Sequence, residues 1–177
     1  MPRIQPPKTD SRDPVQSSAL AHQPALLAAF TRLYGTLWSH GLLDLPTKEM
    51  TRLRNARITD CTFCRSVRFS GAREAGLTEG LVDEIRDGYA QSDALTQRQK
   101  AALRFTDAFL RDPAGHHEKL RAELLLHFTP AEIVELAAGV ALFMGFSKIA
   151  VALGQVPREM PVTVMPTPDH SFEKDES

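Results

Sequence analysis

The chain has 177 residues, and its 21 lysines and arginines nearly balance 22 aspartates and glutamates, which gives a formal net charge of −1. This balance excludes a strongly basic nucleic-acid-binding protein and an acidic tail protein. Hydrophobic residues make up 42% of the chain and charged residues 24%, as in one ordinary globular domain of this length. With two cysteines, the chain is no disulfide-rich secreted scaffold, and we expect a reducing, cytoplasmic location.

The two ends differ in composition from the centre, because four of the 12 prolines lie in residues 1–17 and four in residues 157–177. We expect an extended or disordered leader over 1–17, a helical domain over 18–156 and a Pro-rich C-terminal tail over 157–177. Within the tail, Val162–Pro166 is apolar enough to dock somewhere, on this chain or on a neighbouring subunit. The longest apolar stretch, Leu136–Phe146, is too short to span a bilayer, so we expect no membrane partner.

Between the ends, apolar residues recur every three or four positions, which is the period of amphipathic helices. Start and stop signals divide this region, because Pro46 opens a helix, Gly76 ends one, and Thr129–Glu132 form a capping-box sequence. We expect about seven helices, at residues 20–40, 47–58, 61–75, after Thr78, from Thr96 to Pro113, 117–128 and 130 to about 153. The last is apolar over most of its circumference, which predicts burial within or between subunits. The predicted fold class is therefore an all-α bundle that oligomerises through apolar helices.

Cys61 and Cys64 lie three residues apart at the start of the expected helix 61–75. That spacing puts both side chains on one helix face, with Cβ atoms about 5–6 Å apart, close to the geometry of a disulfide. A helix N-terminus favours thiolate over thiol. Positive charge nearby in the sequence acts in the same direction, from Arg57, Arg65 and Arg68. The pattern predicts a redox pair, in which one thiolate attacks and the other cysteine resolves the intermediate.

Two other interpretations of the cysteine pair stay open. Cysteine is among the most buried residue types, so both thiols could be inert core. The pair could also be half of a zinc site with His116 and His117, although zinc sites usually contain a second close pair of ligands. We expect no metal and no cofactor.

Glu49 is the second candidate. If the helices before and after Asp60 fold back antiparallel, Glu49 lies opposite Arg68–Ser70, where its carboxylate could pair with Arg68 or accept a proton from the thiols. The alternative is a glutamate in the first helical turn that faces solvent.

The segment from Glu49 to Gly76 resembles the AhpD-like alkylhydroperoxidase and carboxymuconolactone decarboxylase family, and weaker similarity covers residues 45–155. The redox branch of this family has a glutamate, eleven residues, Cys-x-x-Cys, three residues and a histidine. Glu49, Cys61 and Cys64 stand at the matching positions. The resemblance implies an AhpD-like bundle that forms dimers, trimers or hexamers and acts as a thiol-dependent peroxidase or disulfide reductase.

The resemblance also implies roles for these residues. Cys64 would be the attacking cysteine, Cys61 the partner that closes the disulfide, and Glu49 the distal member of a proton relay. The partners would be a small-molecule peroxide or carboxylate and an external thiol or disulfide reductant.

Arg68 departs from the family pattern, because it stands where the relay histidine is expected. Arginine is always charged and cannot pass a proton. It can still stabilise a Cys64 thiolate, pair with Glu49 or bind a carboxylate substrate. Loss of general acid–base catalysis removes a factor of typically about 10²–10⁴ in rate, so peroxidase turnover could be impaired.

Two further functions stay open. The non-redox branch of the resembled family acts on lactones and carboxylates without a cysteine pair, and Arg68 could hold such a carboxylate. The chain could also be a non-enzymatic helical oligomer that senses redox state through a reversible disulfide. A nucleic-acid partner is not expected, because no aromatic stacking platform accompanies the basic residues Arg52, Arg54 and Arg57.

Overall fold

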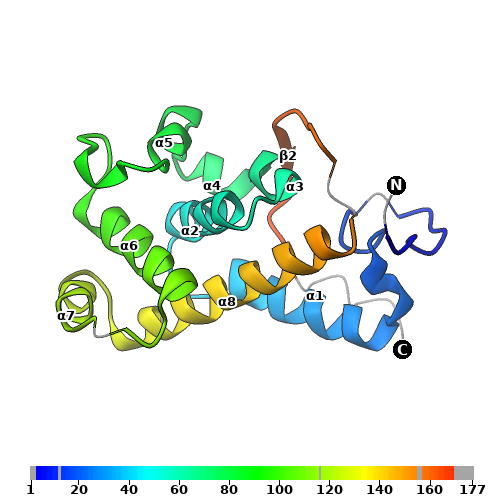
Figure 1. Cartoon of the computed structure of the whole chain (residues 1–177), viewed down its shortest axis with the longest axis horizontal. Helices are drawn as coiled ribbons and strands as arrows, with labels where there is room; N and C mark the ends of the chain where they lie inside the picture. The colour runs from blue at the N-terminus through cyan, green and yellow to red at the C-terminus, as the bar shows by residue number, and fades with distance from the viewer. Residues whose placement is uncertain (1–2, 12, 116, 155–156, 170–177) are drawn as a thin grey trace.

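The structure, a computed structural model, describes residues 3–11, 13–115, 117–154 and 157–169. Within these ranges the chain is an α-helical bundle with one very small sheet (Figure 1), which confirms the predicted all-α class. The helices are α1 (Pro24–Ser39), α2 (Leu45–Ile58), α3 (Thr62–Ser66), α4 (Ser70–Glu74), α5 (Glu79–Glu84), α6 (Gln97–Arg111), α7 (Glu118–His127) and α8 (Pro130–Ala152). Two short 3₁₀ helices, η1 (Ala19–His22) and η2 (Tyr89–Gln91), and two strands, β1 (Val67–Phe69) and β2 (Thr163–Met165), complete the described elements.

Most helix starts follow the predicted signals. Thr96 and Thr129 each close a capping box, at the start of α6 and of α8. The second helix begins at Leu45, one residue before the predicted proline, because the side chain of Asp44 supplies the N-cap. The first helix is shorter than predicted, since residues 19–22 form η1 instead.

The prediction of one continuous helix over 61–75 is wrong. The segment is divided into α3, β1 and α4, and β1 runs parallel to β2 with Val67 opposite Thr163 and Phe69 opposite Met165. Extended backbone suits a β-branched residue such as Val67 and an aromatic residue such as Phe69. The partner strand comes from the C-terminal tail, so a local hydrophobic period could not indicate it.

The described part of the tail is fixed to the bundle beyond β2. Gly71 N donates a hydrogen bond to Thr167 Oγ1 at 2.9 Å, and Ser39 Oγ donates to Pro168 O at 2.6 Å. A Cβ atom at Gly71 would lie 2.7 Å from Thr167 Oγ1, so glycine permits this close approach. The predicted docking of Val162–Pro166 is confirmed by the β1–β2 pairing.

The helix α2 is polar in sequence and yet lies at the centre of the molecule, against α6 and α8 (Figure 1). Every residue from Thr47 to Ala56 is buried. Buried charges are costly unless they are paired, and here they are paired. Lys48 Nζ lies 2.9 Å from Glu135 Oε1, and Arg54 Nε lies 2.6 Å from Asp107 Oδ1. This buried polar helix supports the candidate site.

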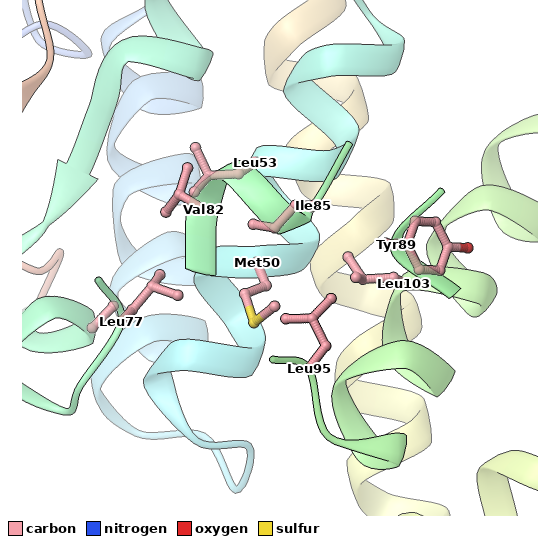
Figure 2. Close-up of a cluster of buried hydrophobic side chains, with 9 residues drawn as sticks. Met50, Leu53, Leu77, Val82, Ile85, Tyr89, Leu95 and Leu103 are labelled. Atoms are coloured by element: carbon pink, nitrogen blue, oxygen red, sulfur yellow. The ribbon is translucent and has the colours of Figure 1, made fainter. Parts of the chain in front are cut away.

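Apolar packing surrounds α2 on two sides. Figure 2 shows the cluster that joins α2 to α5 and α6, which consists of Met50, Leu53, Ala72, Leu77, Val82, Ile85, Tyr89, Leu95 and Leu103. On the other side lies α8, which by length and composition alone could cross a membrane. It packs against α1, α2 and α6, as the core helix of a globular fold does, and leaves part of its apolar surface exposed.

Candidate active site

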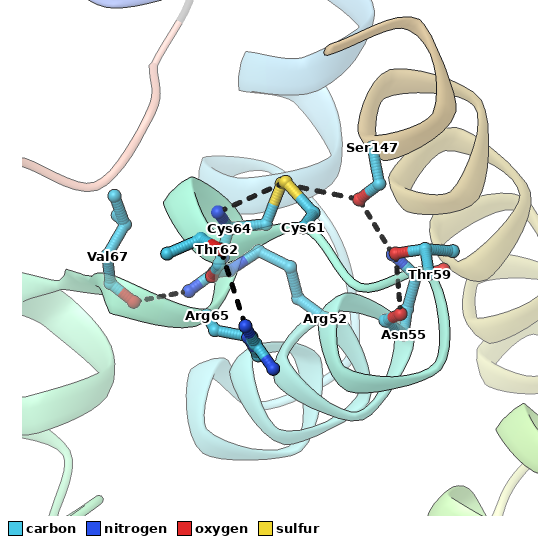
Figure 3. The surroundings of a disulfide bond; sticks show 9 residues. All are labelled: Arg52, Asn55, Thr59, Cys61, Thr62, Cys64, Arg65, Val67 and Ser147. Atoms are coloured by element: carbon cyan, nitrogen blue, oxygen red, sulfur yellow. Dashed lines mark hydrogen bonds between the residues drawn. A yellow bond between two sulfur atoms is a disulfide. The ribbon is translucent and has the colours of Figure 1, made fainter. Parts of the chain in front are cut away.

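Cys61 and Cys64 are joined by a disulfide at the start of α3 (Figure 3). Cys61 is the N-cap residue of this helix, and its Sγ accepts a hydrogen bond from Cys64 N at 3.2 Å. Asp60, between α2 and α3, is a turn residue with φ of 52°. Cys61 is 0% exposed and Cys64 5%, so Cys64 is the more accessible member of the pair.

Glu49 is completely buried in α2, which excludes the solvent-facing alternative. Its carboxylate accepts hydrogen bonds from Arg52 Nε at 2.7 Å and Nη2 at 2.6 Å, and from Phe69 N at 3.2 Å. The predicted position of Glu49 opposite residues 68–70 is therefore confirmed by the backbone of Phe69. Burial acts to lower the pKa of Arg52, but Glu49 raises it by more, so the two groups form a buried ion pair.

Arg52 connects Glu49 to the disulfide segment (Figure 3). Its Nη1 donates to Cys64 O at 2.6 Å and its Nη2 to Val67 O at 2.7 Å. The guanidinium also lies over the ring of Phe69, 5.0 Å from its centroid. Sequence analysis missed Arg52 as a site residue. The available signal was its i,i+3 spacing from Glu49, which brings both side chains to one helix face.

Arg68 does not pair with Glu49, which was one of the roles that the sequence left open for it. Arg68 lies in β1, where successive side chains point to opposite sides, so its side chain is directed away from that of Phe69. It pairs with Glu79, with 3.1 Å between Nη2 and Oε2, and its Nη1 donates to Arg65 O at 2.6 Å. Arg68 thus braces the backbone beside the disulfide and is not among the residues that line the pocket at Cys64.

Ser147 of α8 is a second residue that sequence analysis missed. Its Oγ donates a hydrogen bond to Cys64 Sγ at 3.4 Å and accepts one from Asn55 Nδ2 at 3.1 Å (Figure 3). Ser147 is 2% exposed and Asn55 0%, so both of these polar side chains are buried. No local signal could have found Ser147, because more than 80 residues separate it from Cys64.

Cys64 faces a pocket of about 160 Å³. Residues 165–169 of the tail and 13–16 of the leader form part of its wall. Burial raises the pKa of Tyr34, which also lines the pocket, to about 12, so its phenol stays neutral. A cavity of about 150 Å³ holds a benzene-sized ring. The rest of the wall is largely aromatic, and Thr31, Arg52, Val67 and Ser147 complete it. The aromatic residues are Phe30, Phe63, Phe69, Phe143 and Phe146.

The described residues contain no group of three or more His, Cys, Asp or Glu side chains arranged to hold a metal. The ring of His117 lies 2.7 Å from Asp112 O at the start of α7. His116 lies outside the described residues. In the part of the chain that the structure describes, no second pair of ligands lies beside Cys61 and Cys64 to complete a zinc site.

Comparisons with known proteins agree with this geometry. The model of the carboxymuconolactone decarboxylase family matches residues 24–108, which include Glu49, both cysteines and Arg68. Over this range the chain is similar to the carboxymuconolactone decarboxylase family. The resemblance found in the sequence is confirmed, although the match begins earlier and ends before Ser147.

Part of the chain is also similar in sequence to a mycobacterial protein. An uncharacterized protein of Mycobacterium tuberculosis is 38% identical over 112 residues, which are 63% of this chain and 39% of that protein. This chain therefore spans about two fifths of the length of that relative.

Two solved structures have a fold similar to that of this chain. An alkylhydroperoxidase AhpD core protein from Ralstonia eutropha has a TM-score of 0.67 and 24% identity, over 79% of this chain and 74% of that one. A debrominase in complex with 2,3,4-tribromopyrrole has a TM-score of 0.66 and 19% identity, over the same shares of 79% and 74%. Proteins with this fold thus include a peroxidase-related protein and a debrominase.

Proposed function

We propose that this protein is a thiol-dependent peroxidase, in which Cys64 attacks a small organic hydroperoxide and Cys61 closes the disulfide. One observation carries the proposal: Cys64 lines an apolar pocket and is bonded to a cysteine three residues away. The peroxidase-related relatives support the same chemistry.

The reaction needs no group beyond the two cysteines and an external reductant. The Cys64 thiolate attacks one peroxide oxygen, the O–O bond breaks, and the alkoxide takes up a proton and leaves as an alcohol. Cys64 is then a sulfenic acid. The Cys61 thiol attacks its sulfur, the disulfide forms, and the hydroxyl group leaves with the Cys61 proton as water. An external thiol partner supplies two electrons and two protons to restore both thiols, in a reducing compartment such as the cytoplasm.

Ser147 provides a polar side chain beside Cys64. In the reduced protein its hydroxyl can donate a hydrogen bond to the Cys64 thiolate, and Asn55 fixes the hydroxyl by donating to its oxygen. Hydrogen bonds to a charged acceptor are stronger than neutral ones, so this contact favours the thiolate. A serine hydroxyl cannot act as a general base for the Cys64 proton, as a histidine could. The proposed peroxidase therefore has a lower turnover than one with the relay histidine.

Glu49 acts through Arg52 in this proposal. Both carboxylate oxygens are occupied by the Arg52 guanidinium, which in turn holds the carbonyl groups of Cys64 and Val67. The pair therefore holds the backbone of Cys64 and positions the attacking sulfur. Arg68 braces the same backbone through the carbonyl group of Arg65.

The substrate is a small apolar hydroperoxide, because the pocket is largely aromatic and holds a group about the size of one ring. Carboxylate chemistry of the decarboxylase type has less support. Arg68, the expected carboxylate ligand, is not a pocket residue, and Arg52 is already occupied by Glu49.

We also propose that the chain forms a homo-oligomer. Large apolar side chains are exposed on α1, α7 and α8, among them Leu33 of α1, Leu126 of α7 and Val134 of α8. Between α6, α7 and α8 lies an apolar hollow of about 420 Å³. Sedimentation velocity should give a mass that is a multiple of the 19.6 kDa chain. A single-chain mass would contradict the oligomer.

Single cysteine variants test the peroxidase proposal. Cys64→Ser should consume no tert-butyl hydroperoxide. Cys61→Ser should consume one equivalent and accumulate a sulfenic acid that dimedone traps, because Cys64 can react but nothing resolves it. Peroxide consumption by Cys64→Ser at the wild-type rate would refute the proposal.

Turnover separates the enzyme from a redox sensor. With excess dithiothreitol and peroxide, the wild-type protein should consume many equivalents of peroxide. A single round of disulfide formation without turnover would identify a sensor. Activity on a lactone carboxylate that survives replacement of both cysteines would identify the decarboxylase alternative.

A further inference from the structure

Five arginines converge on a second pocket, of about 260 Å³, which shares no lining residue with the pocket at Cys64. It lies at the C-terminal ends of α2 and α6 and beside α3 and the turn after α5. Asp87 is its one acidic lining residue. The converging side chains are Arg54, Arg57, Arg65, Arg86 and Arg111.

Three of these five arginines have a carboxylate partner, and two of the partners are strongly exposed. Arg54 pairs with the carboxylates of Asp107 and Asp87. The other two pairs are Arg65 with Asp60 and Arg86 with Asp83. Since the Asp60 and Asp87 side chains are 85% and 92% exposed, water and salt screen their charges.

Arg57 and Arg111 have no carboxylate within 4 Å among the residues that the structure describes. Arg57 is half-buried, and its Nη2 donates to the carbonyl group of Val82 at 3.0 Å. Burial lowers the pKa of Arg57, and the nearby charge of Arg86 lowers it further. The last turns of α2 and α6 favour cations, which explains single arginines there. Helix ends do not explain why these side chains converge on one pocket, where like charges repel.

We propose that this pocket binds a phosphate group. A phosphate dianion matches the two guanidinium groups that lack a carboxylate, Arg57 and Arg111, and its oxygens suit the planar fork of arginine. A monocarboxylate would neutralise only one of them. The pocket is open to solvent on one side, so the phosphate can be free or can belong to a larger ligand such as a nucleotide.

Calorimetric titration of the wild-type chain with inorganic phosphate tests the site, in a chloride buffer of matched ionic strength. Saturable binding of one phosphate per chain is expected. Binding that does not exceed the chloride background would overturn the proposal. Titration with adenosine monophosphate and with adenosine identifies the source. Tighter binding of the nucleotide than of phosphate supports a larger ligand, equal binding supports free phosphate, and binding of adenosine alone contradicts the site.

Variants that each remove one arginine charge, inside or outside the pocket, test whether phosphate binds in this pocket. Arg57→Met should weaken phosphate binding at least about tenfold, because a charge-assisted, forked contact is lost. Arg111→Met tests the second guanidinium group of the site in the same way. Because Arg111 is exposed, its replacement leaves the core intact. Arg32→Met, on the exposed face of α1, removes the same charge elsewhere and should leave binding unchanged. Equal weakening by Arg32→Met would show attraction to net charge alone and would overturn the proposal.

Discussion

Ser147 gives a test at the scale of single residues. In the Cys61→Ser background Cys64 is the sole thiol, so its reaction with iodoacetamide reports the thiolate. Ser147→Ala removes a donor to the charged form, and the charged form becomes less favourable. The pH midpoint of alkylation should rise by about one to two units, because a hydrogen bond to a charged group contributes about 1.5–3 kcal/mol.

Ser92→Ala is the matched control for this measurement, since Ser92 lies in the loop before α6, away from the pocket at Cys64. It should leave the alkylation profile as it is. An unchanged midpoint in Ser147→Ala would show that the serine hydroxyl does not stabilise the Cys64 thiolate.

The buried ion pair of Glu49 and Arg52 makes a second prediction. Glu49→Ala leaves the Arg52 guanidinium buried without its counter-charge, so the free energy of unfolding should fall by about 3–5 kcal/mol. The control has the same i,i+3 spacing at the surface: Asp83→Ala removes the exposed partner of Arg86 and should cost less than about 0.5 kcal/mol. Urea unfolding of both variants measures the difference. Similar losses in both would contradict the buried role of Glu49.

Sequence reasoning located part of the site, and the parts that it missed depend on contacts between segments far apart in the chain. The positions of Glu49, Cys61 and Cys64 followed from the helix–turn–helix arrangement about Asp60. Arg68 was misplaced because an expected helix is a strand there, which turns the side chain toward Glu79. Ser147 was beyond reach, since only the packing of α8 on the disulfide brings it close.

At the scale of elements, local sequence patterns gave no indication of the tail strand β2 or of its pairing with β1. Periodicity and capping residues located most of the helices, because both signals act within a few residues. The division of 61–75 depends on a strand near the other end of the chain, so no local pattern could predict it. The buried polar helix α2 was likewise hidden, because its charges are satisfied by partners on other elements.

The tail also closes the pocket, which can be tested by truncation. Deletion of residues 162–177 removes β2 and the part of the pocket wall at 165–169. Dithiothreitol should then reduce the Cys61–Cys64 disulfide several-fold faster, because thiol–disulfide exchange depends on access to the sulfur. Release of free thiols over time measures the rate.

Deletion of residues 170–177 is the control for the truncation, because it retains β2 and every described residue of the wall. Its reduction rate should equal that of the full chain. Equal rates in all three proteins, with circular dichroism showing intact helices, would mean that the tail does not limit access.

At the scale of the whole molecule, both tyrosines of the chain link stability to alkaline pH. Burial raises the pKa of Tyr34 and of Tyr89 to about 12, against about 10 in an unfolded chain. Below pH 10 both states hold the phenol protons. As the pH rises from about 10 to 12, the unfolded chain releases them first, so the stability of the fold falls across this window.

Absorbance at 295 nm checks the tyrosine prediction directly. The native protein should show little tyrosinate at pH 10.5, and the protein in denaturant should be more than half ionised. Tyr34→Phe should remove one of the two late titrations. Ionisation of both phenols near pH 10 in the native protein would contradict their burial.

The central claim is that Cys61 and Cys64 form a couple that a small hydroperoxide can oxidise. Mass spectrometry of the fully reduced chain, after one equivalent of tert-butyl hydroperoxide, tests it most directly. We predict that the mass of a single chain falls by that of a pair of hydrogen atoms, with both free thiols lost and no link between chains. Two intact thiols, or chains joined to one another by disulfides, would contradict it.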